Sequence, residues 1–169
     1  MSYFGLADML DNVVRRLQGP RTDLVLPEVD LTGSVAVLTG ASTVTGQEMV
    51  RALARRGAKV IVAARNVEDV KAAAEDIDLQ NIRVIKCDLA SFTSVREFCR
   101  QVEEEEEKVD ILINNAETFS TERVLTEDGQ DTVFQVNHLS RFLLTNLLLD
   151  KLKASKAARI INVSNVPCW

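Results

Sequence analysis

Cysteine and histidine are scarce in this sequence. Its 169 residues include three cysteines and one histidine, and Cys87, Cys99 and Cys168 show no C-x-x-C spacing. This set offers too few ligands in any pattern for a structural zinc site, so no metal site is predicted. An odd number of cysteines without such spacing favours an intracellular, reducing compartment, and we expect Cys87 and Cys99 to be small buried hydrophobes.

Long hydrophobic runs and an excess of basic charge are also missing. No apolar stretch approaches the roughly 18 to 20 residues that a transmembrane helix needs. Lys and Arg number 20 against 25 Asp and Glu, whereas a nucleic-acid-binding domain carries a basic excess on one face. The run Glu103 to Glu107 accounts for the net charge of -5 and is expected to face solvent at a helix end. The sequence thus predicts no membrane span and no nucleic-acid partner.

The first 30 residues are predicted to form an amphipathic helix and a linker. Apolar residues recur at helical spacing between residues 3 and 17, and Gly19 and Pro20 then end the pattern. Asp8 and Asp11 lie within this helix, and such acids are atypical of a mitochondrial presequence or a secretory signal. We expect the helix to dock on protein or lie against a bilayer surface, with a targeting role as the alternative.

From residue 31 to residue 169, strand-like apolar runs alternate with helical patterns. The strand-like runs cover residues 34–38, 59–63, 82–87, 109–114 and 159–163. Helical patterns cover residues 46–56, 67–77 and 129–153, and Ser91 is the predicted N-cap of another helix. This alternation is typical of βαβ units, so the sequence predicts an α/β domain with a parallel sheet over residues 31–169.

The turn between the first strand and its helix has the context of a phosphate-binding turn. Residues Thr39 to Gly46 follow an apolar strand directly and open a helical pattern. Glycines in such a turn let the backbone bend tightly and approach a pyrophosphate, which the helix N-terminus then stabilises. Two glycines, Gly40 and Gly46, are weak support when taken alone.

Several motifs of the α/β region occur together in one known family. They are the turn at 39–46, Arg-Gly-Ala-Lys-Val at 56–60, Cys-Asp-Leu at 87–89, Ile-Leu-Ile-Asn-Asn-Ala at 111–116, Val-Asn-His-Leu at 136–139 and Arg-Ile-Ile-Asn-Val-Ser at 159–164. With them the chain resembles the N-terminal half of a short-chain dehydrogenase/reductase, most of all the retinol dehydrogenase-like members. The resemblance covers residues 31 to 164. It implies a Rossmann-type doubly wound parallel sheet of five strands in the order 3-2-1-4-5, truncated after the fifth strand.

The resemblance also implies a dinucleotide site. It assigns Gly40, Ser42, Thr45 and Gly46 to the pyrophosphate turn, Asp88 and Leu89 to the adenine, and Asn115 and Ala116 to the adenine ribose. Arg65 stands where an acid would bind the 2'-hydroxyl of NAD, and a guanidinium there favours the 2'-phosphate of NADP. The alternative is that Arg65 is an ordinary surface cation.

Some residues depart from the family pattern at this site. Val44 replaces the middle glycine of the turn, and its branched side chain should resist unusual backbone angles and obstruct a phosphate. Glu117 replaces the glycine after Asn-Asn-Ala and brings a carboxylate close to a polyanion. Ser140 replaces the glycine after Val-Asn-His-Leu. We therefore expect NADP binding to be weak or lost.

The residues that carry out catalysis in the family are incomplete in this sequence. The family uses a tyrosine as general acid/base with a lysine four residues later, and this sequence has a single tyrosine, Tyr3, and no Tyr-x-x-x-Lys. Asn137 matches the helix asparagine of the proton relay, while Asn165 stands at the position of the serine that polarises the substrate carbonyl. No catalytic set is intact, so the chain alone is not expected to be a dehydrogenase.

Three functional hypotheses follow. The first, which the departures from the family pattern and the missing tyrosine and lysine favour, is a non-catalytic scaffold or interaction subunit. The second is a fragment, or a half completed by another chain, of an NADP-dependent oxidoreductase acting on a retinoid, a steroid or another lipophilic alcohol or carbonyl. The third is a module that senses NADP without turnover.

A partner surface is predicted along the last two strands, because both faces of a parallel sheet need cover and an open edge can pair with another strand. Its apolar residues would be Ile111, Ile113, Ile160, Ile161 and Val163. The N-terminal helix, a partner protein or a second copy of the chain are the three candidates to cover it.

Overall fold

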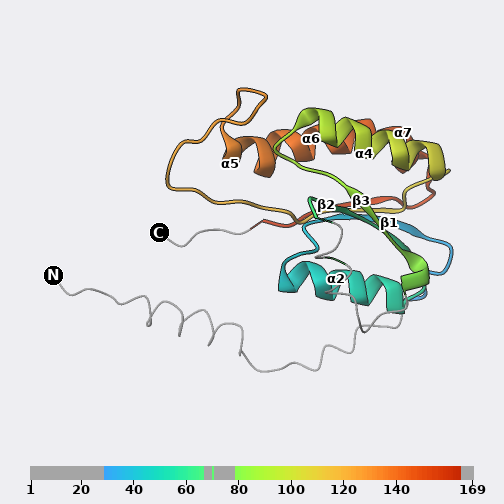
Figure 1. Cartoon of the computed structure of the whole chain (residues 1–169). Coiled ribbons are helices and arrows are strands. Elements are labelled where there is room, and N and C mark those ends of the chain that lie inside the picture. The colour runs from blue at the N-terminus through green and yellow to red at the C-terminus, as the bar shows by residue number, and fades with distance from the viewer. Residues whose placement is uncertain (1–28, 67–69, 71–78, 165–169) are drawn as a thin grey trace, which may run out of the picture.

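A single parallel sheet of five strands organises the chain (Figure 1). The structure is a computed structural model and describes residues 29–66, 70 and 79–164. The strand order is β3-β2-β1-β4-β5, as the resemblance implied, and every pair is parallel. The strands are β1 Val35–Thr39, β2 Lys59–Ala64, β3 Ile82–Lys86, β4 Ile111–Asn114 and β5 Arg159–Asn162.

The helices lie in two layers, one on each face of the sheet (Figure 1). Helix α2, Val44–Arg55, covers one face, and α4, Phe92–Glu105, covers the other together with α6, Ser140–Leu147, and α7, Leu149–Ala154. A 3-10 turn, η1 Leu79–Asn81, precedes β3. The predicted helices at 3–17 and 67–77 lie outside the described residues, apart from Val70. No helix in the described ranges is long and apolar enough to cross a membrane.

The single long helix predicted over residues 129–153 is wrong in its continuity. The segment starts with a short α5, Thr132–Phe134, continues as a π-helical segment, η2 Gln135–Leu139, and then forms α6 and α7 with a break at Leu148. Apolar periodicity along the chain did not reveal the π-helical segment. Such a segment depends on contacts with neighbouring elements, and the periodicity of one helix carries no information about those contacts. Such segments are frequent at functional sites.

Two apolar clusters form the core, one on each side of the sheet. The cluster facing α4 and α6 includes Phe98 and Leu144, both completely buried, and the cluster facing α2 includes Leu38 and Val62. The free thiols of Cys87 and Cys99 belong to the first cluster, which confirms them as small buried hydrophobes. Burial raises the pKa of each thiol to about 12, so neither is a reactive thiolate near neutrality.

The N-cap predicted at Ser91 is confirmed, and a second N-cap, Thr43 of α2, was not predicted. Ser91 caps α4 by accepting the Ser94 N–H, and Thr43 caps α2 by accepting the Gly46 N–H at 3.1 Å. Each cap satisfies one of the N–H groups that a helix start leaves without an intrahelical acceptor.

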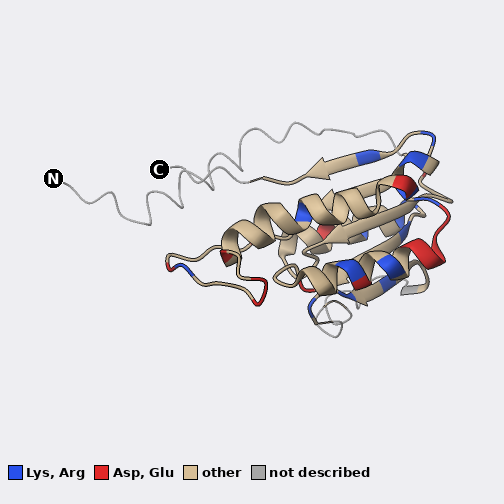
Figure 2. Ribbon diagram, turned by 90° about the horizontal axis from the view of Figure 1, so that it is seen from above, with Lys and Arg blue, Asp and Glu red and all other residues tan. Residues whose placement is uncertain are grey.

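The glutamate run at the end of α4 is only partly solvated. Figure 2 shows acidic residues gathered at the C-terminal end of α4, and Glu103, Glu104 and Glu107 are exposed. Glu106 is different: its side chain is buried and lies 2.5 Å from the ammonium group of Lys59. The prediction that the whole run faces solvent is therefore wrong at Glu106, because tertiary packing brings the first residue of β2 against it.

The open edge at β5 partly matches the prediction. All four residues of β5 are exposed, and Ile160 and Ile161 each keep 43% of their surface accessible. Ile113 is buried, at 5% exposure, because its side chain joins the cluster on the α2 side. The exposed apolar surface is therefore concentrated on β5 and does not extend across β4.

Asp110 connects several elements at the amino end of β4. Its carboxylate accepts the Val35 N–H at 2.9 Å, the Ser155 hydroxyl at 2.6 Å and the Lys108 ammonium at 3.0 Å. Burial raises the pKa of Asp110, but these hydrogen bonds and the charge of Lys108 lower it more, so the pKa lies below its ordinary value of 3.8. The charged form therefore stabilises the fold.

We predict that Asp110→Asn destabilises the domain by about 1–2 kcal/mol at pH 7, as expected for lost hydrogen bonds to a charged group. Because the folded pKa is depressed, this stabilisation is fully present above the ordinary carboxyl value and is lost as pH falls through the lower folded value. Urea unfolding at pH 7 and at about pH 3 measures the difference. Asp150→Asn, at an exposed position, is the control, and an equal effect of both changes at pH 7 would contradict the prediction.

Candidate functional site

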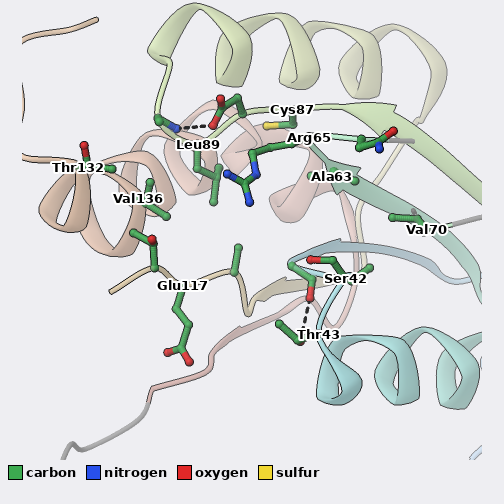
Figure 3. Close-up of a pocket in the computed structure, with 18 residues that line it drawn as sticks. Ser42, Thr43, Ala63, Arg65, Val70, Cys87, Leu89, Glu117, Thr132 and Val136 are labelled. Carbon is green, nitrogen blue, oxygen red and sulfur yellow. Dashed lines mark hydrogen bonds between the residues drawn. The ribbon is translucent and has the colours of Figure 1, made fainter. Parts of the chain in front are cut away.

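A pocket of about 460 Å³ opens at the carboxyl ends of the central strands (Figure 3). Its wall combines the turn after β1, the end of β2, the segment after β3, the loop after β4 and the start of the α5–η2 segment. In an open parallel sheet, ligands bind at this edge, where the strand order reverses between β1 and β4. The volume falls within the range of small-molecule sites.

The glycines of the turn are required by close packing. Gly40 has a φ of +78°, and a Cβ there would lie 2.6 Å from the backbone N and Cα of Ala116. A Cβ on Gly46 would lie 2.1 Å from the Gly40 carbonyl oxygen. The turn therefore packs against the segment after β4 at Gly40, and the first turn of α2 packs against it at Gly46. Both contacts are so close that only glycine fits at these two positions.

The predicted pyrophosphate residues divide into two groups. Gly40 and Ser42 line the pocket, and Thr43 lines it beside them. Thr45 and Gly46 are not among the lining residues of this pocket: Thr45 is exposed on the first turn of α2, and Gly46 is buried beneath Gly40. The sequence pattern identified the turn, but part of it serves packing.

Val44 does not distort the backbone. It is the first residue of α2, and among the described residues only glycines have a positive φ. The expectation that Val44 resists an unusual backbone angle is therefore wrong, because this position is already helical. Its side chain is 78% exposed, and the effect of its bulk on a phosphate stays a prediction.

The loop after β4 is held against β1 by polar contacts. The Thr39 hydroxyl accepts the N–H groups of Asn115 and Ala116, each at 3.0 Å. The Asn115 side chain donates to the Gly40 carbonyl at 3.0 Å, so its amide closes the turn, while Ala116 lines the pocket. Thr39 was not selected by sequence reasoning, and its only signal was a hydroxyl at the end of an apolar strand.

The segments that follow β2 and β3 bring Arg65 and Asp88 to the pocket wall. Figure 3 shows the Arg65 side chain reaching into the pocket from the end of β2. Within the described part of the chain, its guanidinium makes no hydrogen bond or ion pair. The Asp88 carboxylate accepts the Ala90 N–H at 2.9 Å, which fixes the segment after β3, and Leu89 is buried beside it.

Glu117 lies at the end of the pocket opposite Val70, and Asn137 holds the loop next to it. Glu117 lines the pocket and is exposed, and in Figure 3 its side chain points away from Arg65. Asn137 lies on η2, where its side chain accepts the Thr118 N–H and donates to the Thr118 carbonyl, both at 2.8 Å. Its amide therefore fixes the loop, while Asn165 lies outside the described residues.

Ser140 and Arg141 bring further polar groups to this edge. Ser140, where the family has glycine, is completely buried, and its hydroxyl donates to the Leu89 carbonyl at 2.5 Å. The Arg141 guanidinium donates to the carbonyl groups of Ala116 and Val163. Sequence reasoning missed Arg141, because nothing along the chain indicates that a helical arginine points inward.

These features fit an elongated anionic ligand. A helix N-terminus and a glycine turn favour phosphate near Ser42, and Arg65 adds a cation that no acid of the described residues pairs with. No group of three or more His, Cys, Asp or Glu residues that would hold a metal ion is found among the residues described.

Comparison with known proteins agrees with this geometry. The sequence profile described as short chain dehydrogenase matches residues 34–168. The chain belongs to the short-chain dehydrogenase family. Its curated relatives include human retinol dehydrogenase 13, 49% identical over 140 residues, which cover 80% of this chain and 42% of the relative. Mouse retinol dehydrogenase 12 is 46% identical over 142 residues, covering 82% and 45% of the two chains.

Solved structures of this family share the fold. A metagenomic short-chain oxidoreductase in complex with NADP has a TM-score of 0.72 and 30% identity, and the match covers 82% of this chain and 64% of that one. The Pseudomonas aeruginosa RhlG complex with NADP has a TM-score of 0.67 and 31% identity, with 80% and 56% covered. The chain spans less than half the length of the two retinol dehydrogenases named above.

We predict that Gly40→Ala destabilises this short-chain dehydrogenase domain more than Gly129→Ala does. Both glycines have a positive φ, of +78° and +73°, but a Cβ at Gly129 meets nothing within 4 Å. Each change carries the left-handed backbone cost of about 1–2 kcal/mol, and Gly40→Ala adds the clash with Ala116. Urea unfolding of both variants measures the difference, and equal losses would show that the turn does not need the close approach.

Proposed function

We propose that the pocket binds NADP(H) and that the chain supplies the dinucleotide-binding half of a retinol dehydrogenase-like oxidoreductase. The observation that carries this proposal is the Arg65 guanidinium, which has no hydrogen-bond or ion-pair partner among the described residues and reaches into a pocket whose wall also includes the Gly40 turn. The fold relatives solved with NADP and the curated relatives named retinol dehydrogenase support it.

Arg65 is the basis for proposing NADP rather than NAD. A 2'-phosphate carries about two negative charges near neutrality, and a guanidinium binds such an oxyanion through two parallel N–H bonds. The NAD ribose would present only a hydroxyl, for which the family uses a carboxylate. Arg65 and Asn66 are the first two residues after β2, and both line the pocket.

We propose that the Glu117 carboxylate lowers the affinity of the pocket for NADP(H). Glu117 lines the pocket, and its negative charge raises the energy of a nearby polyanion. Because Glu117 is exposed and points away from Arg65, water screens much of this repulsion. Weakened rather than abolished binding is the outcome that we propose.

The proposed reaction class is hydride transfer between NADP(H) and a lipophilic alcohol or carbonyl such as a retinoid. The bound dinucleotide would supply or accept the hydride, and residues of this chain would hold its phosphates and adenosine. The proton transfer of the family needs a tyrosine and a lysine four residues later, and Tyr3 is the only tyrosine in the sequence. We propose that the 169 residues alone bind NADP(H) without turnover.

Titration calorimetry of the purified chain with NADPH and NADH tests the proposal. We expect saturable NADPH binding in the micromolar range, and an affinity at least about tenfold lower in Arg65→Gln, since a hydrogen-bonded charge pair contributes about 1.5–3 kcal/mol. Arg55→Gln, which removes an exposed cation from the last turn of α2, is the matched control. Absence of NADPH binding, or equal binding by the Arg65 variant, would contradict the proposal.

We propose a protein-contact role as the second candidate function, because β5 is an exposed edge. Its four residues are accessible, and Ile160 and Ile161 add apolar surface to its open backbone groups. Edge strands of this kind pair readily with another strand. In a purified sample the available partner is a second copy of the chain.

We predict that the purified chain self-associates through β5 and that Ile161→Lys reduces this association. A lysine on an edge strand opposes pairing by its charge. Light scattering of the wild type, Ile161→Lys and the control Ala157→Lys at equal concentration makes the comparison. A monomeric wild type, or association unchanged in Ile161→Lys, would argue against this role for β5.

A further inference from the structure

A row of polar side chains runs along η2 and α6 at intervals of four residues. Asn137 contacts the backbone of Thr118, as described above. Arg141 donates to the Ala116 carbonyl, and the Thr145 hydroxyl accepts from the Asn114 side chain at 3.3 Å. The partners of this row are therefore every second residue of β4 and the loop that follows it.

The rise per residue along the two segments explains why successive members of the row meet successive partners. The four residues from Arg141 to Thr145 on α6 rise by about 6.0 Å, and the two residues from Asn114 to Ala116 advance by about 6.6 Å when the chain is extended. The order is reversed, because the partners run from 118 to 114 while the row runs from 137 to 145. A helix that returns across a parallel sheet has this antiparallel direction. The row therefore contacts alternate residues at the carboxyl end of β4 and in the loop that follows it.

Arg141 is the central member of the row and the only one that joins two strands. Its Nε donates to the Ala116 carbonyl at 3.2 Å, where Nη2 donates as well, and Nη1 donates to the Val163 carbonyl at 2.9 Å. Ala116 follows β4, and Val163 follows β5. The guanidinium therefore connects the pocket wall with the end of the edge strand.

The chemistry of the guanidinium suits this task. Burial lowers the pKa of Arg141 while the nearby charge of Glu117 raises it, and an arginine stays charged at neutral pH in either case. Its planar fork points several N–H groups in fixed directions, whereas a lysine offers one compact ammonium group. Replacing Arg141 by lysine would therefore keep the charge and lose the two-sided connection.

Arg141 is held in place from the other side as well. The preceding residue, Ser140, donates to the Leu89 carbonyl after β3. On Ala116 itself, the N–H is bound by Thr39 and the carbonyl by Arg141, so both backbone groups of this pocket residue are fixed. Past Ala116, the wall continues through Glu117 and Thr118.

We propose that Arg141 is a positioning residue that holds the pocket wall at Ala116–Thr118 and the end of β5 in register for the half of the dinucleotide that extends away from Arg65. This inference rests on the proposed NADP(H) site. The Arg65 end would bind the 2'-phosphate and the adenine, and Ala116 would flank the adenine ribose, as the resemblance implies. The remaining phosphate, ribose and nicotinamide would run along the wall past Ala116, at Glu117 and Thr118.

The test compares two ligands of different length. Adenosine 2',5'-bisphosphate carries the groups proposed for the Arg65 end, whereas NADPH also carries the nicotinamide half. In Arg141→Leu we expect the NADPH affinity to fall about tenfold, as for one lost charge-assisted positioning contact, and the affinity for the bisphosphate to fall by less than about twofold, because Thr39 still holds the Ala116 N–H beside the adenine ribose. Arg141→Lys should show the same pattern, because it lacks the fork, and it serves as the folded variant if circular dichroism shows that Arg141→Leu does not fold.

A merely structural role would weaken both ligands together. Arg100→Leu, which removes an exposed guanidinium from α4, is the matched control and should bind both ligands as the wild type does. Wild-type affinity for NADPH in both Arg141 variants, or equal loss of both ligands, would overturn the positioning role and leave the proposed function standing. Failure of the wild type to bind either ligand would overturn the proposed function and this inference with it.

Discussion

The close approach of the Gly40 turn to the end of β4 is the constraint on which the site depends. Gly40 meets the backbone of Ala116 where no side chain would fit, and the Thr39 hydroxyl and the Asn115 amide bind the two segments together. Because this contact is made by backbone and by groups next to it, it sets the distance between the glycine turn and the opposite pocket wall.

The opposite wall is fixed from the helix layer. Polar side chains of η2 and α6 bind backbone groups of the segments after β3, β4 and β5. A parallel sheet is normally packed with apolar contacts on both faces, and the described core follows this pattern over α4 and α2. Polar contacts gather at the edge formed by the carboxyl ends of the strands. Hydrogen bonds fix the direction and register of the loops there, which apolar contacts alone would not do. The pocket is therefore shaped between two sets of hydrogen bonds with an apolar core beneath.

The residues that depart from the family pattern differ in their effect on the structure and on the pocket. Val44 takes an ordinary helical conformation, and the buried Ser140 hydroxyl finds an acceptor in Leu89, so neither disrupts the fold. Glu117 is the departure with a direct electrostatic consequence, because its carboxylate lines the pocket. The family assignment thus rests on the fold and motifs, while the proposed cofactor affinity would depend on a few side chains at the edge of the cleft.

The sequence by itself determined the alternation of strands and helices, the helix cap at Ser91 and the location of the glycine turn, because these depend on local periodicity and on backbone preferences. The family resemblance added the strand order. Tertiary structure decided which side chains meet: it buried Glu106 against Lys59, buried Ile113 beneath the α2 side, interrupted the last long helix at η2 and turned Arg141 onto two carbonyl groups. These contacts join residues far apart in the chain, so no local pattern encodes them, and only the packing of the helices on the sheet brings their partners together.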